Sequence, residues 1–137
     1  MSPERAEAVV KVLMGEAMFN GWGVRTLARG EVAYNPIDYQ VGAVWPHDNS
    51  LIAAGLKRHG YGRDASRIFS ALFDAASRFE QFRLPEVFSG IARDEYPSPV
   101  RYPVACSSQA WSAGTLPYLL ETAPGLEANA LKSEFRI

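Results

Sequence analysis

The sequence has little cysteine and no excess of charge of either sign. Its 137 residues include one cysteine, Cys106, which excludes a disulfide within the chain and any cysteine-rich metal site. The formal net charge is −1, without basic or acidic blocks, which argues against nucleic acid and anionic membrane surfaces as partners. No apolar run is long enough to span a membrane, and the N-terminus lacks the layout of a signal peptide, so we expect a cytoplasmic protein.

What is present is the composition of a globular domain that contains four helical segments. Hydrophobic residues make up 47% and charged residues 21% of the chain, so we expect one domain over residues 1–137. Apolar spacing predicts helices over about 2–19, 48–59, 64–82 and 107–123. Asp64 is the expected N-cap of the third helix, and a cap on the second helix is the simplest role for Asp48. The predicted fold class is all-α.

The connections between these helices predict how they are arranged. About four residues join the second and third helices, which makes this pair antiparallel, whereas the segments 20–47 and 83–106 are unusually long. If the helices alternate in direction, both long loops lie at one end, over the N-termini of the second and fourth helices. These two helices carry little charge, as enclosed helices do, so we expect two layers with these as the inner ones.

The two long loops are rich in aromatic residues, which lie close to carboxylates and to amide or guanidinium donors. Such side chains suit carbohydrates, because rings stack on the apolar faces of sugars while polar groups bind the hydroxyls. Glu86, which follows Pro85 and precedes Val87 and Phe88, is the most attractive catalytic carboxylate. The alternatives are that the aromatic residues form a small core of their own and that Glu86 is a solvated loop residue.

A metal site and a thiol nucleophile are weaker hypotheses. His47 and Asp48 are adjacent and do not supply three converging ligands, and His59 lies at the far end of its helix. A Cys106–His47 nucleophilic pair has no supporting motif around the cysteine. We therefore expect no metal and no cofactor.

Four motifs carry a resemblance to a known family. "GWGVRTLA", "YNPIDYQVGAVWPHDNSLIAAGL", "RLPEVFSG" and "YPVACSSQAWSAG" resemble, in this order, the C-terminal part of the catalytic domain of bacterial glycogen-debranching-like enzymes. These belong to the amylo-α-1,6-glucosidase group, six-hairpin glycosidases that invert configuration and fold as (α/α)6 toroids. The resemblance implies a partial toroid and an α-glucan or oligosaccharide as the partner.

The resemblance also implies roles for individual residues. Glu86 would be the general base that activates water. The sugar subsite would be walled by side chains of the first long loop and the helix that follows it, namely Trp22, Arg25, Tyr39, Trp45, His47 and Asp48. Gln109 and Trp111 would line its bottom.

The sequence departs from the family pattern in one respect that argues against activity of this chain on its own. The family's catalytic domain is several times longer, and its general acid, an aspartate, lies upstream of anything in this sequence. Because the reaction needs two carboxyl groups, we expect a part of a glycosidase that is inactive alone. Its inner helices would expose apolar faces, which favours self-association. The alternatives are a non-catalytic helical module that binds carbohydrate or oligomerises, and a generic helical scaffold.

Overall fold

The computed structural model describes residues 1–129 and 132–136 and confirms the all-α prediction. The helices are α1 (Pro3–Leu13), α2 (Pro46–Arg58), α3 (Gly62–Ala76) and α4 (Ala110–Thr122). A 3-10 turn, η1 (Glu80–Phe82), follows α3, and a short antiparallel hairpin of β1 (Glu127–Asn129) and β2 (Glu134–Arg136) follows α4. No helix in the described residues is long and apolar enough to cross a membrane.

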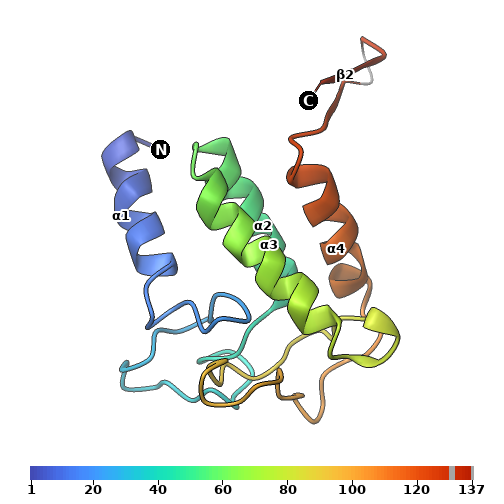
Figure 1. Cartoon of the computed structure of the whole chain (residues 1–137). Coiled ribbons are helices and arrows are strands. Elements are labelled where there is room, and N and C mark those ends of the chain that lie inside the picture. Colours follow the sequence, from blue (N-terminus) through green and yellow to red (C-terminus); the bar gives the residue numbers. More distant parts are fainter. Residues whose placement is uncertain (130–131, 137) are drawn as a thin grey trace.

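The helices alternate in direction, as predicted from the loop lengths. Figure 1 shows both long loops gathered at one end of the helices, while the short turn between α2 and α3 lies at the opposite end. The N-termini of α2 and α4 therefore point toward the loops, and each loop delivers the chain to one of them. The gathered loops form the end of the molecule where a site can be built.

The helix boundaries differ from the predictions in specific ways. The second helix begins at Pro46 with Trp45 as its N-cap, so Asp48 lies in the first turn and the predicted cap role is wrong. The third helix begins at Gly62 after Tyr61, so Asp64 is likewise a first-turn residue. Proline fits the first turn because its missing N–H would have no helical partner there. In both cases an acidic residue still complements the helix dipole without capping.

Helix α2 occupies the centre of the packing, against both α3 and α4. The core combines Ile68 and Leu72 of α3 with Leu119 of α4, and it continues into the loops through Trp22 and Phe88. The expected exposed apolar surface is present on α4, where Trp111, Tyr118 and Leu120 are open to solvent. Self-association through this surface stays a prediction.

Short β-bridges hold the two long loops together. Val44 of the first loop and Phe88 of the second exchange both backbone hydrogen bonds, at 2.9 and 3.0 Å. Arg25 pairs with Val44 on one side, and Arg101 pairs with Phe88 on the other. Four segments that are distant in sequence thereby lie side by side, which fixes the positions of the residues next to them, Trp45 and Glu86 included.

Candidate functional site

The best-defined polar cluster of the loop end is centred on the carboxylate of Glu86. The hydroxyl of Tyr39 donates to Glu86 Oε1 at 2.7 Å, and Gln109 Nε2 donates to the same oxygen at 2.9 Å. The backbone N–H of Cys106 donates to Oε2 at 3.2 Å. Hydrogen bonds to a charged acceptor are among the stronger ones, so three donors from two segments, the first long loop and the entry to α4, fix this carboxylate in place.

The local sequence explains why Glu86 lies at the surface of the cluster while its neighbours are buried. Leu84, Val87 and Phe88 all pack into the interior, and the backbone N–H of Glu86 donates to the carbonyl of Cys106 at 2.9 Å. The apolar flanks anchor the segment, and the contact with Cys106 sets its distance from the entry to α4. Glu86 itself is half-buried, so its carboxylate is held rigidly but remains within reach of a ligand.

Tyr39 is electrostatically coupled to Glu86. Its hydrogen bond to the carboxylate, together with desolvation and the negative charge of Glu86, raises the pKa of Tyr39 to about 12. Ionising the phenol would remove its proton from the hydrogen bond and place two negative charges side by side. Tyr39 therefore stays protonated and continues to donate up to about pH 12.

This coupling leads to a testable prediction. Glu86→Gln should lower the pKa of Tyr39 from about 12 toward the ordinary tyrosine value of 10.0, because the neighbouring negative charge is gone. Tyrosinate absorbance after rapid pH jumps would measure it, with Tyr39→Phe identifying the Tyr39 signal by subtraction. An unchanged titration in Glu86→Gln would show that the two side chains do not interact in solution.

Two aromatic rings pack on Tyr39, the tyrosine that donates to the carboxylate. The ring of Tyr39 lies edge-on to Trp45, with centroids 4.8 Å apart, and is tilted against Tyr102 at 5.6 Å. Trp45 Nε1 donates to the carbonyl of Tyr39 at 3.0 Å, which locks the indole to this loop. His47 packs against Trp111 with centroids 4.7 Å apart, and Trp111 is 58% exposed. Trp45 and Tyr102 therefore flank the tyrosine that holds the carboxylate, and an anchored carboxylate beside aromatic rings is a combination that suits a sugar.

Two residues expected in the sugar subsite lie inside the protein instead. Trp22 has no exposed surface, and its ring packs under the guanidinium of Arg93 at 4.3 Å. Arg25 is 3% exposed, and its donors bind the backbone carbonyls of Glu16, Ala17 and Gly90. Both residues stabilise the paths of the loops, and neither makes a contact with Glu86. Burial also lowers the pKa of Arg25.

The other residues predicted for the sugar subsite differ in how closely they are connected to Glu86. Tyr39 and Gln109 are brought directly to Glu86 as hydrogen-bond donors, a role that the sequence did not predict. Trp45 is linked to the cluster through Tyr39. His47 and Trp111 form a separate, tilted ring pair, and each lies two residues from a member of the cluster, Trp45 or Gln109. Asp48 is exposed and is not among the described residues that hydrogen-bond to the Glu86 carboxylate.

Asn49 is a structural residue of this end that sequence reasoning missed. Its side chain accepts from the N–H of Val24 at 2.6 Å and donates to the carbonyls of Val24 and Trp45. It thus ties the first loop to the first turn of α2 although it is fully buried. Tyr102 is one of several aromatic residues in the second loop, and the sequence alone gives it no particular role. No local sequence signal reveals either contact, because each depends on how a distant loop folds back.

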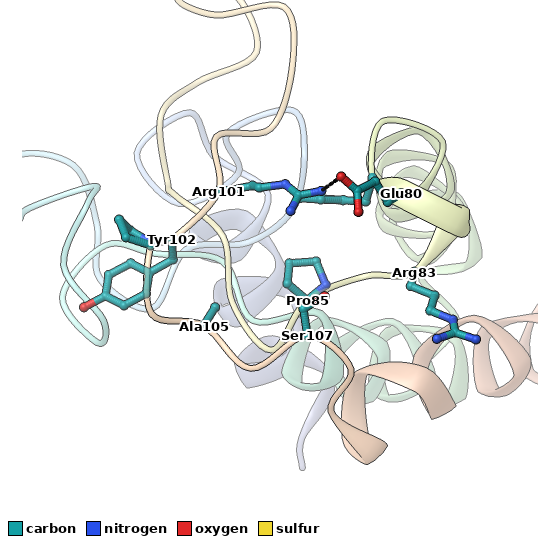
Figure 2. A pocket seen from close by; sticks show the side chains of 9 residues that line it. Glu80, Arg83, Pro85, Arg101, Tyr102, Ala105 and Ser107 are labelled. Atoms are coloured by element: carbon teal, nitrogen blue, oxygen red, sulfur yellow. Dashed lines mark ion pairs between the residues drawn. The ribbon is translucent and has the colours of Figure 1, made fainter.

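A separate pocket of about 150 Å³ adjoins this cluster. Figure 2 shows Pro85 and Tyr102 in its lining, with Arg83 on the side opposite Tyr102. Arg101 pairs with Glu80 at 3.5 Å across the upper part of the view. Glu86 does not line it, so the pocket is a neighbour of the candidate site and not part of it. Among the described residues no group of three or more His, Cys, Asp or Glu side chains could hold a metal ion.

An anchored carboxylate among aromatic rings is the kind of site with which glycoside hydrolases act on sugars. Residues 1–89 match the model of a family described as the mannosylglycerate hydrolase MGH1-like glycoside hydrolase domain. The match spans more than half of the 137 residues, and the chain belongs to this family. No curated protein matches the chain.

This match confirms part of the sequence-based identification. The chain belongs to a glycoside hydrolase family of the six-hairpin type, and carbohydrate is the substrate class that the family suggests. The match does not support a debranching enzyme in particular. It includes Glu86, Tyr39 and Trp45, whereas Gln109 and Trp111 lie beyond its end.

Proposed function

We propose that this chain provides one wall of a glycoside hydrolase active site in which Glu86 is the general base of an inverting hydrolysis. The observation that carries the proposal is the Glu86 carboxylate, held by Tyr39, Gln109 and the Cys106 amide between aromatic rings. In this reaction the base removes a proton from water as the water attacks the anomeric carbon, while a carboxylic acid protonates the departing oxygen.

The neighbouring residues have two distinct roles in this proposal. Tyr39 and Gln109 position the base, because both donate to the same carboxylate oxygen and leave Oε2 with a single, longer hydrogen bond from Cys106. Oε2 is therefore the oxygen that accepts the proton from water. Trp45, Tyr102 and Trp111 offer ring faces or edges to the sugar, and His47 supports Trp111 from behind.

The reaction needs a second carboxyl group, and none of the hydrogen bonds that Glu86 makes within the described residues involves one. We propose that the acid lies outside this network and that the 137-residue chain alone is inactive. An assay of the chain alone, and of the full coding sequence that contains it, tests this directly. Hydrolysis by the chain alone would show that it contains its own acid.

The motif resemblance and the matched family suggest two different classes of substrate. The motif resemblance favours α-glucans or oligosaccharides and a debranching type of α-1,6-glucosidase. The description of the matched family names mannosylglycerate, which carries a carboxylate. Arg83 favours the acidic substrate, because it is exposed and three residues before Glu86, and its guanidinium is hydrogen-bonded only to Ser108 Oγ, at 3.3 Å, among the described residues. Parallel assays with maltooligosaccharides, branched α-glucan and mannosylglycerate would distinguish these substrates.

The alternative to an enzyme is a non-catalytic carbohydrate-binding module, since the aromatic wall alone could hold a sugar. The hydrolase and the binding-module hypotheses both predict that Trp111→Ala weakens sugar binding about three- to tenfold, because an exposed ring that stacks on the sugar is lost. Calorimetric titration with maltotriose and mannosylglycerate measures this.

The matched control for this substitution is Tyr118→Ala, which removes another partly exposed ring of α4, at the end away from the loops. Equal losses in the two variants would indicate a general effect on α4. Binding that is unaffected by Trp111→Ala would remove this residue from the sugar wall, and no binding of any sugar would favour a scaffold.

A further inference from the structure

A groove of about 340 Å³ lies between α3 and the two long loops, away from Glu86. One face of α3 presents Arg63, Ser66, Arg67 and Ser70 to it, at the spacing i, i+3, i+4 and i+7. The first loop contributes Phe19, and the second contributes Arg93. None of these residues takes part in the Glu86 cluster, so the groove needs an explanation of its own.

The groove is electropositive. Three guanidinium groups line it, but Asp74 is the single carboxylate in its lining, paired with Arg93 at 2.8 Å. Asp64, which is not in the lining, lies 3.5 Å from Arg67, the outer limit of a hydrogen bond. Arg63 has no hydrogen-bond or ion-pair partner within the described residues. Positive charges gathered in a concave surface attract anions.

Two of the three guanidinium groups are held in place by aromatic rings. Arg67 lies over the ring of Phe19, 5.0 Å from its centroid, and Arg93 lies over the ring of Trp22 at 4.3 Å. Trp22 is fully buried, so the position of Arg93 is fixed from the core outward. Cation–π contacts of this kind reduce the freedom that a long side chain would lose when it binds a ligand.

We propose that this groove is a binding site for a phosphoryl group, either as free phosphate or as part of a phosphorylated sugar. Guanidinium groups bind such oxyanions through paired, parallel hydrogen bonds, and three of them line this groove, two from α3 and one, paired with Asp74, from the second loop. The Ser70 hydroxyl, which makes no hydrogen bond within the described residues, adds a neutral donor. The assignment does not depend on the role of Glu86.

Calorimetric titration at constant ionic strength tests the proposal with three probes: inorganic phosphate, glucose 6-phosphate and glucose. Phosphate should bind saturably, and Arg63→Gln/Arg67→Gln should weaken it at least about tenfold, because charged hydrogen bonds are lost. Arg58→Gln/Arg78→Gln makes the same change in net charge outside the groove and should bind as the parent does. Arg63→Gln alone is a milder variant, and circular dichroism verifies the fold of each protein.

Each outcome decides for or against the site. Tighter binding of glucose 6-phosphate than of phosphate identifies a sugar phosphate as the preferred source, whereas equal binding identifies free phosphate, and both support the groove. Absence of phosphate binding, equal weakening in the two double variants, or glucose binding as tight as that of glucose 6-phosphate would overturn it. Glu86→Gln should leave phosphate binding unchanged, so failure of the proposed hydrolase activity and failure of this site remain distinguishable.

Discussion

Glu86→Gln should lower kcat of the proposed hydrolase, measured in a protein that contains this chain and hydrolyses sugar, by about 10²–10⁴-fold. The amide has nearly the shape of the carboxylate and can still accept a hydrogen bond from Tyr39, but it cannot take a proton from water. KM should change little, because the aromatic wall that binds the sugar remains in place. Initial rates over a range of substrate concentrations measure both quantities.

Glu80→Gln is the matched control for this substitution. It makes the same chemical change six residues earlier, on the exposed turn η1, where the Glu80 carboxylate has Arg101, at 3.5 Å, as its one ion-pair partner among the described residues. Exposed ion pairs contribute little, so this variant should keep the activity of the parent. Full activity of Glu86→Gln, or an equal loss in both variants, would contradict the assignment of Glu86 as the base.

The second large effect is expected at Gly90, where the backbone of the second long loop lies against that of the first. A Cβ atom at this position would lie far inside van der Waals contact of the Gly42 carbonyl oxygen, and the Gly90 N–H also donates to Pro36 at 2.7 Å. Gly90→Ala must therefore push the loops apart, at a cost of about 1–3 kcal/mol or more in the free energy of unfolding. Urea unfolding followed by circular dichroism measures this.

Gly55→Ala is the same substitution at another position, and we expect it to raise the free energy of unfolding instead of lowering it. Gly55 lies inside α2, and a Cβ there would meet no atom within 4 Å. Alanine should stabilise this helix by about 0.5–1 kcal/mol, since glycine loses more backbone freedom on folding. If Gly90→Ala proved as stable as the parent, the contact between the two loops would not be as the structure shows it.

The arrangement of the helices could be predicted from the sequence, because this arrangement depends on features that are local in sequence. The periodicity of each helix, the short connection after Arg58 and the length of the two loops together fix which ends meet. Helix starts were less well predicted. Asp48 and Asp64 have the side chains of N-caps, but Pro46 and Gly62 allow each helix to begin earlier.

The site was predicted only in part for a physical reason. Glu86 could be singled out because its apolar flanks are local, but its donors come from positions 39, 106 and 109, and their meeting depends on the tertiary path of the loops. The inward direction of Trp22 and Arg25 is also a tertiary property. An aromatic or arginine residue in a long loop has the same local sequence whether it faces a ligand or the core.

The most direct test of Glu86 as the general base is rescue of Glu86→Ala by azide in the active enzyme. Azide needs no base, so it should attack the anomeric carbon from the side that water normally takes and restore turnover. The glycosyl azide product, identified by proton NMR, should have the configuration opposite to that of the substrate. Wild-type turnover of Glu86→Ala without azide, or a glycosyl azide that retains the configuration of the substrate, would contradict the account.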